Sequence, residues 1–158
     1  MPNWPHELYL ITHAECDASG GEVHREAGLS ARGQMQAHEL GRWFEANVPS
    51  AVWSSPFRCA RETARIAIAS SGTHAAVIVD ERLALSDPSQ VLHDAGSLVE
   101  ALRACSYTRL AIVTHGPVVI AISAIIERLP VGALVSRSRG ECAITAYRRE
   151  DGHITRIA

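Results

Sequence analysis

Two histidines, His13 and His115, each follow directly on a short apolar run. The runs Leu8–Thr12 and Leu110–Thr114 have the length and composition of buried strands. If those strands are neighbours in a parallel sheet, both imidazole rings point into one crevice beyond the strand ends. One ring can then act as a nucleophile, and the other can donate to a developing negative charge. The alternative is that each histidine only ends a strand or caps the next helix.

The elements that must position the histidines alternate between strand and helix patterns. Helical patterns separate four apolar runs of strand length, which are Leu8–Thr12, Ala51–Ser54, Ala75–Val79 and Leu110–Thr114. This alternation predicts right-handed crossovers, a mostly parallel sheet and helices on both faces. The tail from Glu141 to Ile157 alternates around Asp151–Gly152, which predicts an antiparallel hairpin at one sheet edge. We expect one α/β domain over residues 1–158, built as a three-layer sandwich.

Four segments carry the signals of a helix start. We expect Ser30 to cap a helix that carries Met35, Leu40, Trp43 and Phe44. Ser55 and Pro56 are expected as the cap and first-turn proline of a helix to about Ala69. Two further helices are expected to start at Asp87–Pro88 and at Gly116–Pro117. The polar stretch Ala14–Leu29, which contains Gly20–Gly21, is instead a long connection. Connections of this length in compact domains are usually functional or mobile. Its place after the first strand predicts a lid over the ligand site.

Composition narrows the classes of partner and compartment. The chain has 158 residues, 47% of them hydrophobic, so it can bury a core without metals or disulfides. Its formal net charge is -2 with no run of like charges, which argues against nucleic acid and anionic membranes as partners. The first residues lack the pattern of a secretory signal, and the longest apolar run, Val118–Ile126, is too short to span a bilayer. We expect a soluble cytoplasmic protein, and nothing in the sequence sets its oligomeric state.

The cysteines carry no recognisable metal or redox motif. Cys16, Cys59, Cys105 and Cys142 lie far apart and form no C-x-x-C pair, which argues against a zinc knuckle and favours a reducing compartment. Cys59 to Arg65 has the C-x5-R spacing of cysteine-dependent phosphatases, but the residues between them lack glycine and favour helix. We therefore expect an inert, at least half-buried thiol at Cys59.

Four motifs occur in order along the chain. Leu8–Glu15 is similar to a strand that ends in R-H-G-E, and Leu29–Ala37 is similar to L-T-x-x-G-x-x-Q-A. Ser54–Ala64 is similar to S-S-P-L-x-R-A-x-Q-T-A, and Val113–Gly116 is similar to a late S-H-G. Together they resemble the histidine phosphatase superfamily, the phosphoglycerate-mutase-like group, and especially its small bacterial phosphohistidine phosphatases. The resemblance implies that His13 accepts phosphate covalently and that His115 stabilises the transferring group. It implies no metal and no cofactor.

The chain departs from these motifs where phosphate would be held. Thr12 stands where the resemblance expects one arginine and Cys59 where it expects another, and Ala14 replaces a glycine. Losing one preorganised donor costs roughly 3 to 4 kcal/mol, so losing two could remove about four to six orders of magnitude in rate. Arg25, on the long loop, and two helix residues could supply a substitute guanidinium. Those helix residues are Arg58 and Arg61, which could equally lie on a solvated face.

The remaining candidates surround the same predicted crevice. The proton donor of the resembled family aligns with Leu85, which cannot donate, so Asp87 is the nearest carboxyl candidate. Asp87 also has a structural role available as the cap of the next helix. Three further residues are expected to bind substrate or to orient the loop, namely Glu15, Ser55 and Gly116.

Two functions remain open. The first is a phosphohydrolase that acts through phosphohistidine at His13 on a small phosphomonoester or a protein phosphohistidine. The second is a catalytically impaired module of the same fold that binds a phosphoanion or a protein. A nucleotide- or flavin-binding protein is a weaker alternative, because residues 12–15 do not form the glycine-rich turn that it requires.

Overall fold

A six-stranded sheet forms the centre of the computed structural model, which describes residues 4–19, 24–137 and 140–158. The strand order is β3-β2-β4-β1-β5-β6. Four strands are parallel, namely β1 (Glu7–Thr12), β2 (Ala51–Ser54), β3 (Ala76–Val79) and β4 (Arg109–Thr114). The expected mostly parallel α/β sandwich is therefore confirmed.

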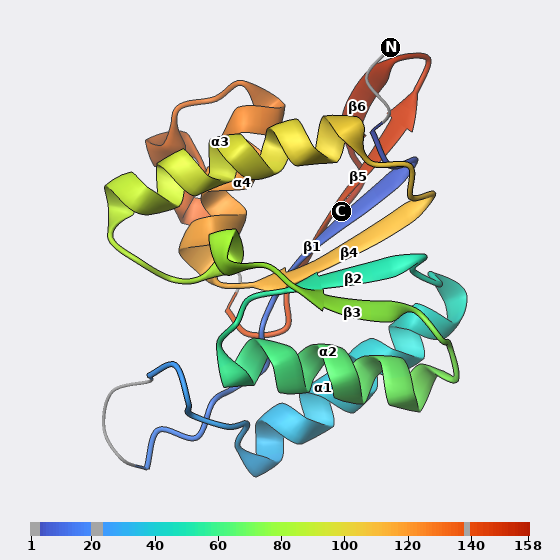
Figure 1. Ribbon diagram of the computed structural model, residues 1–158, viewed down its shortest axis with the longest axis vertical. Helices are drawn as coiled ribbons and strands as arrows, with labels where there is room; N and C mark the ends of the chain where they lie inside the picture. Colours follow the sequence, from blue (N-terminus) through green and yellow to red (C-terminus); the bar gives the residue numbers. More distant parts are fainter. Residues whose placement is uncertain (1–3, 20–23, 138–139) are drawn as a thin grey trace.

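The helices lie in two layers (Figure 1). On one face are α1 (Ala31–Ala46) and α2 (Arg58–Ser71), and on the other are α3 (Pro88–Ala104) and α4 (Gly116–Glu127). Alternate residues of the strands face the two layers. In β1, Leu8 and Leu10 pack with α3 and α4, whereas Tyr9 and Ile11 pack with α1 and α2. Burial on both faces explains why the central strands β1 and β4 are nearly continuous apolar runs, whereas the edge strand β3 is largely exposed.

The C-terminal hairpin closes one edge of the sheet, as expected. It consists of β5 (Ile144–Glu150), which is antiparallel to β1, and β6 (His153–Arg156). The turn residues Asp151 and Gly152 both have positive φ, of 49° and 78°, as a type I′ turn requires.

Three of the four helix starts follow the sequence signals closely, and one of them is α4, which begins at Gly116 with Pro117 in its first turn. The Ser30 side chain caps α1 by accepting from the Gly33 amide at 3.0 Å, and the Asp87 side chain caps α3 by accepting from the Gln90 amide at 3.1 Å. The expected cap of α2 at Ser55 is wrong, because the helix begins at Arg58 and Phe57 is its cap. Of the apolar residues in α1, Met35 lies on the exposed face.

No single helix among the described residues is long and apolar enough to cross a membrane. Only the bent pair Gly116–Glu127 and Val131–Arg137 meets the length and composition criteria together. Several apolar residues of α4, such as Ile122, are buried in the core between helix and sheet, which accounts for its composition.

Candidate active site

The sheet register brings His13 and His115 side by side. Thr12 pairs with Thr114 at the ends of the parallel strands β1 and β4, so the next residue of each strand is a histidine. The ring centroids are 5.0 Å apart, with an interplanar angle of 70°. The carboxyl ends of parallel strands are where ligands bind in such folds. The structure thus places both rings in one site, while their chemical roles remain predictions.

The backbone around His13 is fixed on both sides and its ring has a defined tautomer. Its amide donates to the Thr114 carbonyl at 2.9 Å, and its own carbonyl accepts from the Cys142 amide at 3.1 Å. Ring atom Nδ1 lies 2.8 Å from the Ala14 carbonyl oxygen. Because a carbonyl oxygen can only accept, Nδ1 carries the proton, which leaves the lone pair of the neutral ring on Nε2.

The His115 side chain is buried, and Ser55 and Phe57 contact its ring. It is 4% exposed and caps the start of α4. Its Nε2 lies 2.8 Å from Ser55 Oγ, and the Phe57 ring packs edge-on against it at 4.6 Å. Burial, together with the charge that His13 can carry, lowers the pKa of His115 to about 3. The His115 ring is therefore neutral at pH 7 and can act as a hydrogen-bond donor without carrying a charge.

Helices α1 and α2 position the loop that follows His13. A Cβ atom at Gly33 would lie 2.1 Å from the Glu15 carbonyl oxygen, so only glycine allows α1 to approach this loop. The Glu15 carboxylate accepts from Ser30 Oγ at 2.7 Å, and the Glu15 amide donates to the Gln36 side chain at 2.9 Å. Glu15 therefore ties the loop to α1, as the orienting role predicted for it requires.

The expected lid over the site is described only in part. Its two limbs, residues 14–19 and 24–29, approach each other through an antiparallel bridge between Cys16 and Leu29. The Asp17 amide also donates to the Gly28 carbonyl at 2.8 Å. Gly20 and Gly21, which suggested a lid, lie outside the described residues.

A cleft of about 510 Å³ opens beside His13, and its charged lining is acidic. Among the described residues, three carboxyl groups line it, from Glu15, Asp17 and Glu141, and no arginine does. Glu15 has an exposed ion-pair partner in Arg32, at 3.3 Å. A larger cleft of about 940 Å³ lies elsewhere, between the ends of α3 and α4 and the C-terminal hairpin. It contains neither of the paired histidines, so we place the candidate site at the smaller, acidic cleft.

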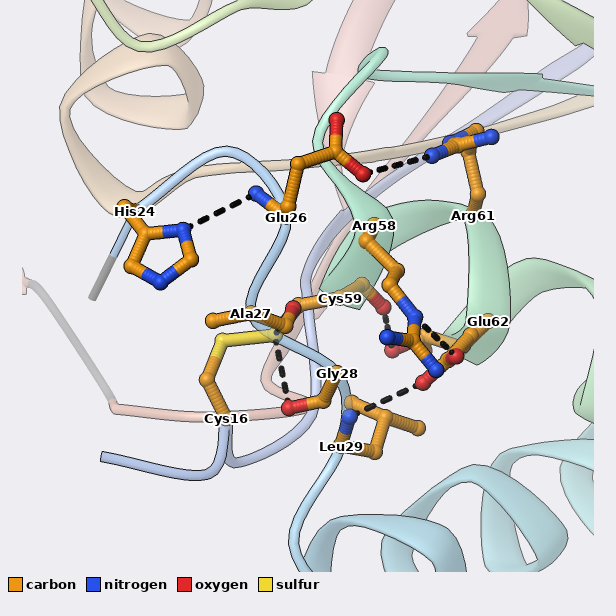
Figure 2. Close-up of polar contacts among 11 residues, drawn as sticks. Cys16, His24, Glu26, Ala27, Gly28, Leu29, Arg58, Cys59, Arg61 and Glu62 are labelled. Carbon is orange, nitrogen blue, oxygen red and sulfur yellow. Dashed lines mark hydrogen bonds and ion pairs between the residues drawn. A yellow bond between two sulfur atoms is a disulfide. The ribbon is translucent and has the colours of Figure 1, made fainter. Parts of the chain in front are cut away.

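The three arginines considered as substitutes for the phosphate clamp have carboxylate partners. Arg25 forms a two-pronged ion pair with Glu81, at 2.9 and 3.0 Å, and lies over the Phe57 ring. In Figure 2, Arg58 and Arg61 are turned toward acidic side chains. Arg58 Nε donates to Glu62 at 2.7 Å, and Arg61 lies 4.0 Å from Glu26. Among the described residues, no arginine is hydrogen-bonded to either histidine of the pair.

The two positions where the resemblance expects arginine have other roles. Thr12 Oγ1 donates to the Gly140 carbonyl at 2.6 Å and accepts from the Ala143 amide at 2.9 Å, which ties the end of β1 to the segment before β5. Cys59 is 2% exposed and forms a disulfide with Cys16 (Figure 2). The expectation of an inert thiol at Cys59 is therefore wrong. Sequence spacing could not reveal this pair, because 43 positions separate its members.

Asp87 and Gly116 lie at helix starts. The Asp87 carboxylate is exposed and accepts from Ser89 Oγ at 2.7 Å and from the Gln90 amide, so it acts as the α3 cap. These bonds hold the pKa of Asp87 below its usual range. Gly116 is the first residue of α4, directly after His115. Among the described residues, neither paired histidine ring is hydrogen-bonded to a carboxylate.

Sequence reasoning missed three contributors to the site. Phe57 covers the His115 ring, Thr63 Oγ1 accepts from the Ala14 amide at 3.0 Å, and Cys16 Sγ lies 3.5 Å from His13 Nδ1. Thr63 and Phe57 both lie within the Ser54–Ala64 motif, so close attention to that motif could have identified them. Cys16 gave one signal, its position three residues after His13.

Comparison with known proteins identifies the family that this chain resembles. Residues 8–84 match the model of the histidine phosphatase superfamily, branch 1. That span contains His13 and the Ser54–Ala64 motif, so the resemblance inferred from the motifs is confirmed. The sequence has no detectable relative among curated proteins.

Three solved structures with a similar fold are named as phosphatases. A provisionally assigned alpha-ribazole-5'-P phosphatase from Escherichia coli has a TM-score of 0.80 at 17% identity, covering 96% of this chain and 95% of its own. A mycobacterial glucosyl-3-phosphoglycerate phosphatase has a TM-score of 0.78 at 19% identity, covering 97% and 98%. A provisionally assigned phosphohistidine phosphatase SixA from Agrobacterium tumefaciens has a TM-score of 0.73 at 17% identity, covering 98% and 97%. At such identities the likeness shows the fold alone.

Proposed function

From the match of residues 8–84 to the histidine phosphatase superfamily, we propose that this protein is a phosphohydrolase that acts through phosphohistidine at His13. One observation carries the proposal, namely the facing rings of His13 and His115 at the ends of two paired parallel strands. Both rings are held by defined contacts, as a preorganised site requires.

The chemistry follows from the two ring environments. Nε2 of His13 attacks the phosphorus atom, so an N–P bond forms while the bond from phosphorus to the leaving group breaks. His115 is neutral, and Ser55 Oγ, which accepts from the Phe57 amide at 3.2 Å, can donate to its Nε2. That bond leaves the His115 proton on Nδ1, where it can donate to the phosphoryl oxygens. Water then cleaves the N–P bond and restores His13.

We expect slow turnover, because the charge around the site opposes a phosphate dianion. The acidic cleft beside His13 contains Glu15, Asp17 and Glu141, and the nearby Arg25 and Arg58 are paired with carboxylates. A guanidinium that stabilises the transferring group typically contributes about 2.7 to 4 kcal/mol to the rate. The chain would have to bind its substrate largely through backbone amides and the two histidines.

The substrate class follows from the shortage of a proton donor. With Asp87 engaged at the α3 cap, the leaving group has to depart without strong assistance from an acid. Good leaving groups, such as a phenolate or the imidazole of a phosphohistidine, are therefore favoured over simple alkoxides. We propose phosphohistidine on a protein, or a small aryl-type phosphomonoester, as the substrate, and no cofactor.

The test combines turnover with trapping of the intermediate. Purified protein is incubated with 4-nitrophenyl phosphate and with a phosphohistidine-bearing protein, and acid-labile phosphate is located by mass spectrometry. We expect turnover and phosphate on His13, both lost in His13→Ala. The matched control is His93→Ala, which changes an exposed histidine on α3 and should leave turnover unchanged.

The acidic cleft favours one alternative, a binding module that has lost turnover. The same protein samples distinguish it. A well-folded wild-type chain that shows neither turnover nor phospho-His13, but whose melting temperature rises with phosphate or a phosphoprotein, would replace the enzyme with the binding module.

A further inference from the structure

Three side chains with soft or borderline metal-binding atoms meet next to the candidate active site. A ring nitrogen of His13 and the sulfur atoms of Cys16 and Cys59 all lie within 4.8 Å of one another. Cys16 Sγ is 3.5 Å from His13 Nδ1. Two ligands of a tetrahedral zinc ion, at about 2.3 Å for sulfur and 2.0 Å for nitrogen, are about 3.5 Å apart. One edge of a zinc site is therefore already formed in this structure.

The two cysteines form a disulfide here, so the site requires reduction. A dithiol such as dithiothreitol would cleave the S–S bond, giving two thiols while the dithiol becomes a cyclic disulfide. The Cα atoms are 5.8 Å apart, so the sulfurs can separate to metal-ligand distance by side-chain rotation. The reduced Cys59 thiol has an acceptor in place, since the Ala27 carbonyl oxygen lies 3.0 Å from its sulfur.

The charge around the cluster suits a cation. The cleft that contains His13 and Cys16 is lined by the carboxyl groups of Glu15, Asp17 and Glu141. Arginine would repel a metal ion, and no arginine in the described part of the chain lines this cleft. A carboxylate or a water molecule in the cleft can complete the coordination that three protein ligands leave open.

We propose that the reduced protein binds one Zn²⁺ through Nδ1 of His13 and the thiolates of Cys16 and Cys59. Two thiolates and an imidazole are ligands that zinc prefers over magnesium or calcium. Binding releases the two thiol protons and moves the His13 ring proton from Nδ1 to Nε2. Under the phosphohydrolase function proposed above, this shift removes the lone pair that attacks phosphorus. Zinc binding and turnover then exclude each other.

The test uses Co²⁺ as a spectroscopic substitute for zinc. The full chain is reduced with dithiothreitol, desalted without oxygen and titrated with Co²⁺, followed by Zn²⁺ displacement. We expect one equivalent of Co²⁺ to give thiolate-to-metal charge-transfer and tetrahedral d–d absorption. Cys16→Ser and Cys59→Ser should weaken binding by about 100-fold or more, since even outer partners of a metal site cost 10- to 100-fold.

Matched controls separate this site from general thiol chemistry. Cys105→Ser removes a free, half-buried cysteine after α3 and should bind Co²⁺ like the wild type. The oxidised wild type should not bind. Reduced wild type without charge-transfer absorption, or a folded Cys59→Ser variant that binds as tightly as the wild type, would overturn the zinc site. Because the readout needs no turnover, a failure of the phosphohydrolase function would leave the result interpretable.

Discussion

One ionisable side chain lies at the amino end of strand β1 and another just beyond its carboxyl end. The charged groups around these two side chains are opposite in sign. At the amino end, the Glu7 carboxylate is buried and accepts from Arg109 Nε at 2.9 Å, from Arg148 Nε at 3.0 Å and from the Tyr9 hydroxyl. Just beyond the carboxyl end, His13 lies beside the acidic cleft, which is lined by Glu15, Asp17 and Glu141 and by no arginine of residues 4–19, 24–137 and 140–158. The chain has 15 arginines and no lysine, and two of these arginines, Arg109 and Arg148, bind Glu7 at the amino end of β1.

The comparison separates structural from chemical use of charge. Burial alone would raise the pKa of Glu7, but the hydrogen bonds from Tyr9, Arg148 and Arg109 together outweigh burial and lower it. These contacts join β1 to β4 and to β5, so Glu7 ties together the central strands. At the His13 end the described ion pair is weaker, because Arg32 lies 3.3 Å from Glu15 and the arginine side chain is largely exposed.

The largest effect that sharpens this contrast is expected from Glu7→Gln. Removing the charge leaves two guanidiniums facing a neutral amide, and breaking a buried ion pair costs several kcal/mol. Because both arginines are partly exposed and can be rehydrated, we expect a loss of about 2 to 3 kcal/mol in the free energy of unfolding. Urea denaturation measures this loss in the free energy of unfolding.

The control is Glu150→Gln, which breaks an exposed 3.8 Å pair with Arg148 and should lower the free energy of unfolding by under about 0.5 kcal/mol. Equal losses in the two variants would remove the contrast.

Sequence patterns predicted the parts of this molecule that depend on local signals. The alternating strands, the caps at Ser30 and Asp87, and the paired positions of the histidines all follow from nearby residues. The α2 start was misplaced because Ser55 accepts from the Phe57 amide in a turn before the helix and contacts His115. The contact between Ser55 and His115 joins residues 60 positions apart, so no local pattern reveals it.

Long-range pairs account for most of what the sequence could not predict. The Arg148 partner of Glu7 and the Cys16–Cys59 disulfide join residues that are far apart in the chain. Their pairing is set by the sheet register and by how α2 packs on the loop after β1. The carboxylate partners of Arg25 and Arg58 are likewise visible only once the loops are placed.

Acid titration sharpens the comparison further, because Glu7, at the amino end of β1, and His115, just beyond the carboxyl end of the neighbouring β4, affect stability in different pH ranges. The folded pKa of His115, about 3, is below its ordinary value of 6.5. The unfolded state therefore binds a proton first as the pH falls below about 6.5, and the folded state loses stability progressively down to about pH 3. The pKa of Glu7 is lowered from its ordinary value of 4.5. The ionised carboxylate therefore stabilises the folded state fully above that pH, and this stabilisation is lost only as the pH falls below it.

Between pH 7 and pH 5, His115 alone should therefore reduce the free energy of unfolding by about 2 kcal/mol. The measurement is urea denaturation at both pH values for the wild type and for His115→Gln, which lacks the titrating ring. We expect the variant to lose less stability than the wild type over this interval. Parallel losses would mean that His115 is not held neutral by burial.

The smallest effect tests whether the charge deficit at the His13 end can be reversed by freeing one arginine. Arg25 is held by Glu81 in an exposed ion pair and lies 5.7 Å from the centre of the Phe57 ring, which packs on His115. Glu81→Gln removes the competing carboxylate at a cost under about 1 kcal/mol in stability, because such exposed pairs contribute little. The released guanidinium then adds positive charge near the histidine pair. We expect inorganic phosphate to bind about two- to five-fold more tightly, as an exposed ion pair of up to about 1 kcal/mol allows. The shift in melting temperature with phosphate concentration measures this affinity.

The matched control for that variant is Glu100→Gln, which frees Arg103 on α3 from a similar exposed pair. Arg103 lies beside Trp4 rather than beside His115, so the control raises the net charge equally without placing a cation at the site. Tighter phosphate binding in Glu81→Gln alone would show that position, and not total charge, limits anion binding at the carboxyl end of β1. An equal gain in both variants would point to net charge, and no gain in either would place Arg25 beyond reach of the histidines. In both of those cases, a positive charge that improves phosphate binding would have to be introduced closer to the histidine rings, at position 12 or 59.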